Sequence, residues 1–553
     1  MRLTSCLRPA RHVVCALVAA PAVVGAQPVD LASLADRVFA PWNRADAPGC
    51  AVGVARGGRT ALLAGYGMAD LESQRAIGAE TIFESGSVAK QFTASAIVLL
   101  ALDGRLSLDD DVRKWIPELP TYDAPITIRH LLNHTSGLRE WSALVAAQGW
   151  ERGRRAHQQA DLLAIITAQR ALNYPVGQTY SYTNSGFALL PTIVERASGQ
   201  SFAAFTRARL FDPAGMTHTR WRDDFTAVVP GRAPAYAPRG REWRLAMPFE
   251  DVHGPGGLLT TAADWLRWNE ALDGKQFGAP WADTLVHRSR TRDGREIAYA
   301  LGVVNDRYRG TREWSHSGAT GGYRTFLARY PDLGRLSIAV LCNAASADPT
   351  ALTHALVDGL HPELTPARRA DTTMVDAAGA ARWVGRWRHA GAHTFARVDG
   401  VDGRLVWGGV RLWPAGDGSW VNASRSRRLV DVARTADRVT RGLLIGAEDD
   451  TTVVERVADP DTSAATLAGF AGQYRSEEID ATYVVSIVDG RVRVQLRPGY
   501  TVSLAPAYRD GFESDALGAV FFSRDARGRV SALHVANGRM WDLVFRRVDG
   551  ARR

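Results

Sequence analysis

The last third of the chain repeats itself. Residues 383–387 (WVGRW) match residues 470–474 (FAGQY), and the same offset of 87 positions separates Asp402-Gly403 from Asp489-Gly490. In the second copy, apolar and polar residues alternate on both sides of Asp489-Gly490, which is the pattern of two strands joined by a tight turn. The repeat therefore predicts two similar antiparallel β-barrel-like domains. We place them at residues 381–460 and 467–553.

The chain before the repeat mixes helical and strand patterns. Helices are expected at 31–39, 88–102, 161–169, 187–197, 261–271 and 349–360, and strands at 50–55, 59–65, 301–304, 323–330 and 336–342. Strands on both sides of a long helical stretch predict an α+β fold, in which an antiparallel sheet packs with helices beside a helical lobe. This domain spans residues 27–362, and a linker at 363–380 leads to the barrels.

Composition argues against a disordered, collagen-like or membrane-embedded chain. The 553 residues are 46% hydrophobic and 23% charged, which are ordinary values for a folded soluble chain. The net charge is +9, but the arginines are interleaved with acids and form no long basic run or nucleic-acid motif. We therefore expect no nucleic-acid partner.

The first 26 residues have the three parts of a secretory signal peptide. Arg2, Arg8 and Arg11 make a positive start, residues 13–24 are apolar but too short to span a bilayer, and small residues precede a cleavage site near Ala26. No later segment has the pattern of a membrane span. We expect a periplasmic or secreted protein.

Two cysteines follow the leader, Cys50 and Cys342. Two buried free thiols are the simpler interpretation. One disulfide, which an oxidising compartment permits, is the alternative.

Lysine is rare, because the 67 basic residues include only Lys90, Lys114 and Lys275. Arginine stays protonated in proteins, whereas lysine can lose its proton. Lys114 and Lys275 have no special context and are expected on the surface. Lys90 differs, because it stands three residues after Ser87 at the start of an expected helix.

Ser87 and Lys90 form an S-x-x-K motif. Residues three apart on a helix share one face, and the positive end of the helix dipole disfavours a protonated lysine. A neutral Lys90 can then accept the proton of the serine hydroxyl. The backbone N–H of Ser87 is available to stabilise an oxyanion. A chance occurrence of the motif is the alternative.

Two further segments carry candidate groups. Tyr182 and Asn184 form a Y-x-N pattern, in which a tyrosine near a lysine can act as a general base and an asparagine can bond both lysine and a substrate carbonyl. Alone, that pattern is more often a capped turn. In residues 314–323, glycines would let a substrate approach a strand edge, although a glycine-rich hairpin has the same composition.

Together these segments resemble the serine β-lactamase and penicillin-binding protein superfamily, and most of all its class C β-lactamase-like branch. Residues 128–138, 212–216 and 256–264 are also similar to that branch, and the resemblance covers about residues 30–362. It implies that Ser87 is the acylated nucleophile, Lys90 its base or proton relay and Tyr182 the partner general base.

The resemblance also implies that Asn184 positions the substrate amide and Lys90, and that the backbone N–H groups of Ser87 and Ala319 form an oxyanion hole. The branch's β-lactamases and carboxypeptidases carry K-T-G as the third motif, whereas this chain has His316-Ser317-Gly318. A neutral histidine contacts a substrate carboxylate more weakly than lysine and in a pH-dependent way. The H-x-G form is similar to D-aminopeptidases and some esterase-like members. His253 is a further pocket candidate, with a structural role as the alternative.

We therefore expect an exported serine hydrolase that cleaves an amide or ester through an acyl-enzyme on Ser87. Its substrates would be D-amino-acid peptides, peptidoglycan fragments or small esters. The alternatives are a β-lactamase, a D-alanyl-D-alanine carboxypeptidase, or a catalytically silent binding or sensing protein of the cell envelope. The 13 histidines have no metal-binding spacing and no phosphate-binding loop is present, so we expect no metal or cofactor. The oligomeric state stays open.

Overall fold

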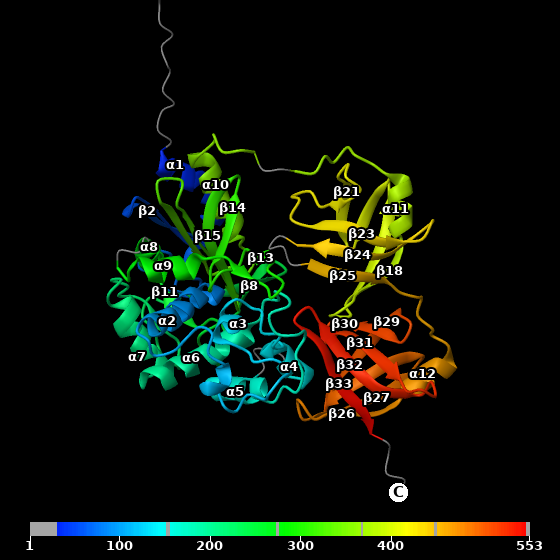
Figure 1. The fold of residues 1–553 in the computed structure, drawn as a ribbon. Coiled ribbons are helices and arrows are strands. Elements are labelled where there is room, and N and C mark those ends of the chain that lie inside the picture. Colours follow the sequence, from blue (N-terminus) through cyan, green and yellow to red (C-terminus); the bar gives the residue numbers. More distant parts are fainter. Residues whose placement is uncertain (1–29, 151–154, 273–275, 367–368, 447–450, 549–553) are drawn as a thin grey trace, which may run out of the picture.

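The computed structural model describes residues 30–150, 155–272, 276–366, 369–446 and 451–548 (Figure 1). The predicted leader and Lys275 lie outside the described residues. An N-terminal α+β domain, coloured blue to green in Figure 1, is followed by two closed antiparallel barrels, coloured yellow and orange-red. The predicted fold class is therefore confirmed.

The N-terminal domain contains the following elements. Its helices are α1 (Leu31–Phe39), α2 (Lys90–Leu102), α3 (Ile128–Leu132), α4 (Trp141–Ala147), α5 (Gln159–Thr167), α6 (Asn184–Ser198), α7 (Phe202–Thr206), α8 (Ala262–Ala271), α9 (Ala279–Val286) and α10 (Pro349–Leu360), with the short helical turns η1 (Ala40–Trp42), η2 (Gly86–Ala89), η3 (Val112–Lys114) and η4 (Arg207–Phe211). Its strands are β1 (Cys50–Arg56), β2 (Arg59–Tyr66), β3 (Met68–Asp70), β4 (Arg75–Ala76), β5 (Phe83–Glu84), β6 (His157–Gln158), β7 (Arg220–Trp221), β8 (Tyr236–Arg239), β9 (Glu242–Leu245), β10 (Glu250–Asp251), β11 (Leu258–Thr260), β12 (Ser289–Arg290), β13 (Glu296–Ile297), β14 (Val304–Tyr308), β15 (Thr311–Thr320), β16 (Tyr323–Tyr330) and β17 (Leu336–Cys342).

The central sheet of this domain has six antiparallel strands in the order β14-β15-β16-β17-β1-β2. Helices α1 and α10 pack on one face, and α8 packs on the other. Every residue of β17 is buried, because helices cover both faces of the sheet at this strand. Helices on both faces favour apolar side chains throughout a strand, and residues 336–342 are hydrophobic except for the buried Ser337.

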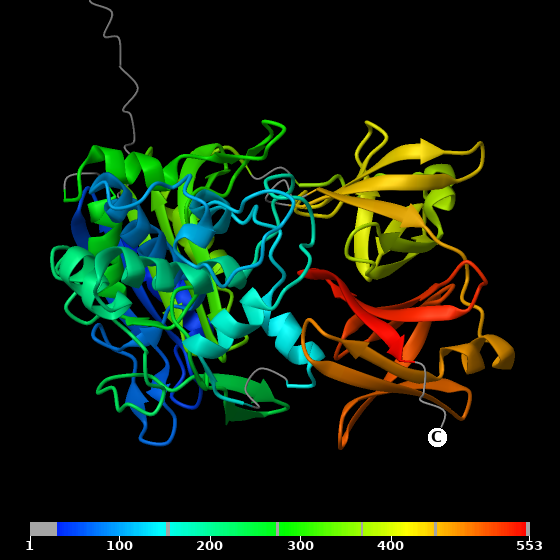
Figure 2. The same ribbon diagram turned by 60° about the horizontal axis from the view of Figure 1, so that its bottom comes forward.

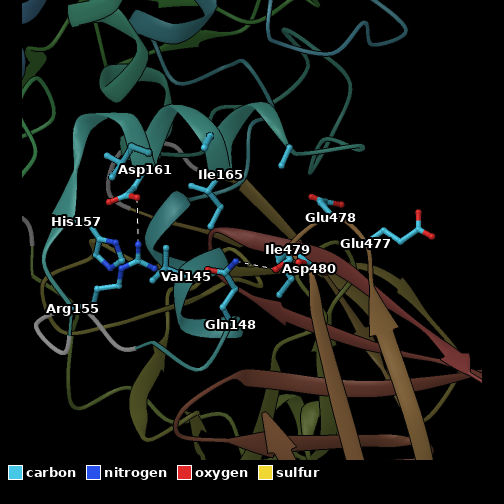
Figure 3. A pocket seen from close by; sticks show the side chains of 13 residues that line it. Val145, Gln148, Arg155, His157, Asp161, Ile165, Glu477, Glu478, Ile479 and Asp480 are labelled. Atoms are coloured by element: carbon cyan, nitrogen blue, oxygen red, sulfur yellow. Dashed lines mark hydrogen bonds and ion pairs between the residues drawn. The ribbon is translucent and has the colours of Figure 1, made fainter. Parts of the chain in front are cut away.

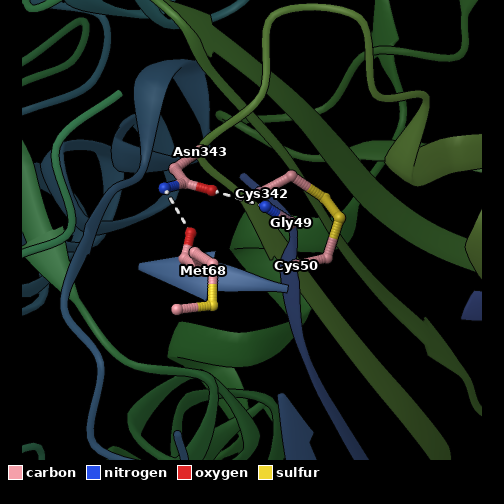
Figure 4. Close-up of a disulfide and its surroundings, with 5 residues drawn as sticks. All are labelled: Gly49, Cys50, Met68, Cys342 and Asn343. Carbon is pink, nitrogen blue, oxygen red and sulfur yellow. Dashed lines mark hydrogen bonds between the residues drawn. A yellow bond between two sulfur atoms is a disulfide. The ribbon is translucent and has the colours of Figure 1, made fainter. Parts of the chain in front are cut away.

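Cys50 and Cys342 form a disulfide between β1 and β17 (Figure 4). The two residues stand opposite each other in the register of the antiparallel pair, so their side chains share one face of the sheet. The neighbouring Asn343 accepts from the Gly49 N–H at 2.9 Å and donates to the Met68 carbonyl at 3.2 Å. The expectation of two free thiols is therefore corrected, because sheet order pairs strands whose cysteines are 292 residues apart.

Most expected elements of this domain are present with shifted ends. The helix expected at 88–102 begins as the 3-10 turn η2 and becomes an α-helix at Lys90. The stretch 301–304 is a bend rather than a strand, and β14 begins only at its last residue. Gly302 has a φ of +74°, and a Cβ there would lie 2.6 Å from the Lys90 carbonyl oxygen. The backbone at Gly302 therefore bends close to the start of α2 and does not continue as a strand.

Each barrel has eight strands, with a helix before the first. Barrel 1 consists of α11 (Ala377–Trp383), β18 (Gly385–His389), β19 (Phe395–Val401), β20 (Arg404–Trp407), β21 (Val410–Pro414), β22 (Trp420–Val421), β23 (Arg428–Arg434), β24 (Val439–Ile445) and β25 (Thr451–Arg456). Barrel 2 consists of α12 (Ala464–Phe470), β26 (Gly472–Ser476), β27 (Ala481–Val488), β28 (Arg491–Arg497), β29 (Tyr500–Tyr508), β30 (Gly511–Ser514), β31 (Gly518–Arg524), β32 (Val530–Asn537) and β33 (Met540–Val548). Helix α11 begins at Ala377, within the segment predicted as the linker.

The repeat positions have matching contacts in the two barrels. Trp387 of β18 donates through Nε1 to the Trp383 carbonyl at 2.8 Å, and Tyr474 of β26 donates through its hydroxyl to the Phe470 carbonyl at 2.7 Å. Both accepting residues are the last of a helix, α11 or α12, and both lie in a barrel core. The aromatic pairs of the repeat thus attach each helix to its barrel.

Both barrels stand on one side of the N-terminal domain, with barrel 2 next to α4 (Figures 1 and 2). Barrel 2 packs against α4, because Leu144 and Ala147 belong to the hydrophobic cluster of that barrel. Within the described ranges, no helix has the length and apolar character needed to cross a membrane.

Candidate active site

Ser87 lies in η2, between β5 and α2. Gly86 has a φ of +52°, and a Cβ there would lie 2.5 Å from the Ala319 nitrogen, so only glycine lets η2 approach β15 this closely. Thr325 of β16 donates to the Ser85 carbonyl at 2.7 Å, which attaches η2 to the sheet from the other side. The candidate nucleophile is therefore held beside the end of β15.

Lys90 is fully buried at the first residue of α2. Its Nζ lies 3.1 Å from Ser87 Oγ, 2.8 Å from Asn184 Oδ1 and 2.9 Å from the Pro255 carbonyl oxygen. The same Nζ is 4.9 Å from the centroid of the Tyr182 ring. The four residues of the first two sequence motifs therefore meet around one ammonium or amine nitrogen.

Asn184 is the first residue of α6, which Thr183 caps by accepting from the Ser185 N–H. The carboxylate of Glu140 accepts from the Asn184 N–H at 2.7 Å and from Asn184 Nδ2 at 3.3 Å. A carboxylate only accepts, so it holds the Nδ2 side of the amide and leaves Oδ1 facing Lys90.

Glu140 is a functional candidate that no sequence motif indicates. It is buried and caps α4, accepting from Ser142 Oγ at 3.0 Å, and α4 is absent from the expected helices. An acid before an apolar run is a helix-start signal, but the seven residues of α4 are too few to show a clear period. The contact with Asn184 depends on a fold in which residues 44 positions apart meet.

Tyr182 rests on a buried aromatic cluster. The His134 ring lies 4.3 Å from the Tyr182 ring and 4.5 Å from that of Tyr299, measured between centroids. Burial, and then the nearby Lys90, lower the pKa of His134 well below its usual value. His134 is therefore a neutral support for the tyrosine, and its own φ of +60° is a left-handed conformation uncommon for a residue with a side chain.

His316 is buried beside the same cluster, and its ring nitrogens contact protein groups. Nδ1 lies 2.6 Å from the Ser317 carbonyl oxygen, and Nε2 lies 3.0 Å from the Tyr299 hydroxyl. Burial, followed by Lys90, lowers the pKa of His316 to about 3. The neutral ring must donate from Nδ1 to the carbonyl, so Nε2 accepts from the tyrosine. Both ring nitrogens of His316 are therefore engaged with groups of the protein itself.

The rest of the third motif lies at the open end of β15. Strand β14 pairs with β15 only as far as Ser315, and Ser317 and Ala319 are exposed beyond it. Gly318 packs on η2, since a Cβ there would lie 2.1 Å from the Ser85 carbonyl oxygen.

The Ser87 side chain lines a small cavity of about 40 Å³. It is lined by Gly86, Ser87, Trp141, Asn184, Glu250, Val252, Pro255, Gly256, Gly257, Ala319 and Thr320. Glu250 is the one residue with a formal charge among these described lining residues. The cavity therefore accepts a small group beside an acid.

Tyr182 lines a second cavity, of about 400 Å³, that all three domains form. Its lining residues are Thr179, Tyr180, Ser181, Tyr182, His389, Thr451, Thr452, Gly538, Arg539 and Trp541. A third cavity, of about 310 Å³, lies where α4 and α5 meet barrel 2 (Figure 3). There Arg155 faces Asp161, and Gln148 donates to the Ile479 carbonyl at 2.9 Å, so this cavity is a seam between domains and does not contain Ser87.

Two other expected residues lie apart from this group. The His253 ring stacks on Phe202 at 5.6 Å between centroids and lines neither the Ser87 cavity nor the Tyr182 cavity. Lys114 is exposed and forms an ion pair with Asp110 at 3.0 Å. Within the described part of the chain, no group of three or more His, Cys, Asp or Glu side chains is placed to hold a metal ion.

One large group of hydrolases places a lysine one helical turn after its serine nucleophile. The η2–α2 turn packed on an antiparallel sheet has this arrangement, and the protein is a serine hydrolase. It belongs to the β-lactamase family, because the family model described as Beta-lactamase matches residues 34–363. The resemblance to the β-lactamase and penicillin-binding protein superfamily is thereby confirmed.

Similar proteins extend this assignment. The chain is 31% identical over 297 residues to penicillin-binding protein 4* of Bacillus subtilis, a match that covers 50% of this chain and 64% of that protein. It is 26% identical over 528 residues to the D-aminopeptidase of Gluconobacter oxydans, covering 91% of this chain and 96% of that protein. The octameric penicillin-binding protein homologue from Pyrococcus abyssi superposes with a TM-score of 0.54 at 20% identity, over 85% of this chain and 99% of that one. The last match shows a shared fold.

Proposed function

We propose that this protein is an exported hydrolase that cleaves D-amino-acid peptides through an acyl-enzyme on Ser87. The observation that carries the proposal is the position of Lys90 Nζ, which touches Ser87 Oγ, Asn184 Oδ1 and the Pro255 carbonyl at once.

The contacts of Lys90 suit a proton acceptor. Two of its three neighbours are carbonyl oxygens, which can only accept hydrogen bonds. An uncharged amine has two N–H donors and one lone pair, so donation to Asn184 and Pro255 directs the lone pair toward the Ser87 hydroxyl. Arginine cannot take this role, because its guanidinium stays protonated.

Acylation then begins with the Ser87 hydroxyl. The Ser87 hydroxyl proton passes to Lys90 Nζ while Oγ forms a bond to the substrate carbonyl carbon. The carbonyl oxygen becomes an oxyanion beside the N–H groups of Ser87 and Ala319. The bond between the carbonyl carbon and the leaving group then breaks. The nitrogen or oxygen of the leaving group takes a proton delivered from Lys90 by way of Tyr182. In deacylation the oxygen of a water molecule forms a bond to the acyl carbon, and the water proton passes by way of Tyr182 to Lys90. The bond between the acyl carbon and Ser87 Oγ then breaks, Oγ takes the proton from Lys90, and the acid is released.

Three observations support a peptide with a free amino group as substrate. Relatives over most of the chain's length carry the name D-aminopeptidase. Glu250 lines the Ser87 cavity and can attract an ammonium group. The third motif offers no lysine, and His316 is held neutral by burial, which leaves a β-lactam or D-alanyl-D-alanine carboxylate without a fixed charge at that position. The contact of Lys90 with Ser87 disfavours a silent binding protein.

Export is supported by the predicted leader and by the buried Cys50–Cys342 disulfide, since disulfides persist in oxidising compartments. Fractionation of cells that produce the full chain tests this part. We expect the protein, shortened near Ala26, outside the cytoplasm.

The catalytic part is tested with Ser87→Ala and the matched variant Ser73→Ala, which changes an exposed serine between β3 and β4. We expect Ser87→Ala to lower hydrolysis of D-alanine p-nitroanilide by about 10⁴-fold or more and to abolish labelling by a fluorophosphonate. Lys90→Arg should be nearly as inactive, and Ser73→Ala should behave like the wild type. Turnover that persists in Ser87→Ala would rule out the nucleophile. Faster turnover of nitrocefin or p-nitrophenyl butyrate by the wild type would favour a β-lactamase or an esterase.

A further inference from the structure

Barrel 2 places a positive charge beside Tyr182. The turn between β32 and β33 contains Gly538 and Arg539, and it projects toward the N-terminal domain. The Arg539 guanidinium carbon lies 4.9 Å from the centroid of the Tyr182 ring. Arg539 is exposed, and no carboxylate in the described part of the chain forms an ion pair with it. Its charge is therefore available to a ligand in the cavity that it lines.

The backbone holds this turn independently of the arginine side chain. The Arg539 carbonyl accepts from the Glu140 N–H at 3.1 Å and from Asn173 Nδ2 at 3.0 Å. On the other side of the turn, the Trp541 N–H donates to Asn173 Oδ1 at 2.9 Å, and the Asp542 carbonyl accepts from Arg139 at 2.7 Å. The side chain of Arg539 can therefore be replaced without releasing the turn.

The cavity beside Arg539 has the character of an anion site. Among its described lining residues Arg539 alone has a permanent charge, and the others include the hydroxyl side chains of Thr451 and Thr452. His389 adds no charge near neutral pH, because burial lowers its pKa to about 4 and its Nδ1 accepts from two backbone N–H groups. A guanidinium with neutral donors nearby matches the two oxygens of a carboxylate.

Tyr182 shows which part of a substrate enters this cavity. It contacts Lys90 on the catalytic side and lines the second cavity together with Arg539. As the group that delivers a proton to the leaving group, Tyr182 marks the side from which that group departs. The Ser87 cavity holds the acyl part, so the leaving part extends past Tyr182 toward Arg539.

The distances agree with a short leaving group. Ser87 Oγ lies 3.1 Å from Lys90 Nζ, which lies 4.9 Å from the Tyr182 centroid, and the Arg539 carbon lies a further 4.9 Å from that centroid. An extended peptide covers about 3.5 Å for each residue. The guanidinium is therefore within reach of a leaving group of a few residues at most.

We propose that Arg539 binds the carboxylate of the leaving group, so that the enzyme prefers short peptides with a free C-terminus to the corresponding amides. This inference rests on the proposed hydrolysis at Ser87. It identifies barrel 2 as the domain that selects the leaving side of the substrate.

The test compares D-alanyl-glycine with D-alanyl-glycinamide in the wild type, Arg539→Gln and Arg539→Lys. We expect Arg539→Gln to lower kcat/KM for the dipeptide by about 10- to 100-fold, as expected for one lost bond between charged groups, and to leave the amide unaffected. Arg539→Lys should keep part of the preference. Arg527→Gln, which changes an exposed arginine in the turn at the other end of β32, is the matched control and should behave like the wild type.

D-Alanine p-nitroanilide, whose leaving group has no carboxylate, separates the two proposals. If the wild type hydrolyses it through Ser87 but Arg539→Gln does not change the ratio of dipeptide to amide, the carboxylate site is wrong and the proposed function stands. An equal loss for both substrates would make Arg539 a general support of Tyr182 and overturn the carboxylate site as well. If none of the D-alanyl compounds is hydrolysed, the proposed function fails and the carboxylate site fails with it.

Discussion

The two barrels share one architecture and differ in what they are attached to. Gly385 and Gly472, 87 positions apart, adopt φ values of +144° and +152°, and both precede the buried aromatic residue that holds the helix. Arg456 lies over the ring of Trp387 in barrel 1, as Arg547 lies over that of Tyr474 in barrel 2. The sequence repeat therefore preserves the internal construction of a barrel.

The attachments are not repeated. Helix α4 of the N-terminal domain contributes Leu144 and Ala147 to the core of barrel 2, and the Tyr483 hydroxyl of that barrel donates to the Ala147 carbonyl. Arg139 forms a buried ion pair with Glu478 at 2.5 Å. Because Glu140 follows Arg139 and holds Asn184, the candidate active site and barrel 2 share one packed unit.

Barrel 1 has its own hydrophobic core and packs against barrel 2. Its hydrophobic cluster is built from barrel residues and α11, with Trp383, Trp387 and Trp407 in contact with one another. It contacts barrel 2, for example where the His393 ring stacks on Phe521 with 4.2 Å between the ring centroids. The comparison teaches that similar sequence copies can fold alike while, among the described residues, only barrel 2 shares a hydrophobic cluster with the N-terminal domain.

Equivalent core mutations offer the strongest test of this difference. Trp387→Ala and Tyr474→Ala each remove a fully buried ring and its bond to a helix, and we expect each to cost its barrel about 3–5 kcal/mol of unfolding free energy. In Tyr474→Ala, activity should be lost when barrel 2 unfolds, because α4 packs into the core of that barrel. In Trp387→Ala, activity should survive the unfolding of barrel 1.

The measurement is a thermal scan of tryptophan fluorescence beside hydrolysis of D-alanine p-nitroanilide at each temperature. If Trp387→Ala loses activity in step with the unfolding of barrel 1, the two barrels support the site equally and the contrast between them is wrong.

Acid should destabilise barrel 1 in a way that its repeat partner does not share. The pKa of His389 in the folded protein is about 4, below its ordinary value of 6.5, because the ring is buried. As the pH falls below 6.5, the unfolded chain binds a proton that the folded chain refuses. Stability is thus complete above pH 6.5 and falls by up to about 3 kcal/mol by pH 4. The equivalent position in barrel 2 is Ser476, which does not titrate.

His389→Asn keeps an acceptor for the Gly391 and Ala392 N–H groups and removes the titration. Thermal unfolding between pH 7 and pH 4 should show a smaller acid loss in this variant than in the wild type. Equal losses would mean that other groups, such as the partly buried His393, control the acid response.

The local parts of the fold and site were predictable. Strands β16 and β17 and helix α10 have the expected bounds, because apolar periodicity and end signals are contained in one segment. Ser87 and Lys90 were recognisable for the same reason, since one helical turn relates them.

The parts that depend on long-range packing were not predictable. The disulfide follows from the order of strands in the sheet, and the neutral, internally bonded state of His316 follows from burial. Arg539 has no local sequence signal, because its contact with Tyr182 joins two domains. A sequence shows which residues can ionise, whereas packing decides which of them face a substrate.

Glu140→Gln tests the smallest expected effect, and it tests the link between barrel 2 and the nucleophile. Glu140 receives the Asn184 N–H and Nδ2 on its carboxylate, while its own N–H donates to the Arg539 carbonyl in barrel 2. Glutamine keeps the shape but offers one acceptor oxygen and a new donor, so Asn184 loses its fixed orientation toward Lys90. We expect kcat to fall about tenfold with KM nearly unchanged, equal to the loss of one hydrogen bond to a charged group. Glu118→Gln, at an exposed ion pair with Arg196, is the control. A fall in melting temperature with an unchanged kcat would make Glu140 a helix cap only, and barrel 2 would then act on the substrate without acting on Lys90, the proposed proton acceptor.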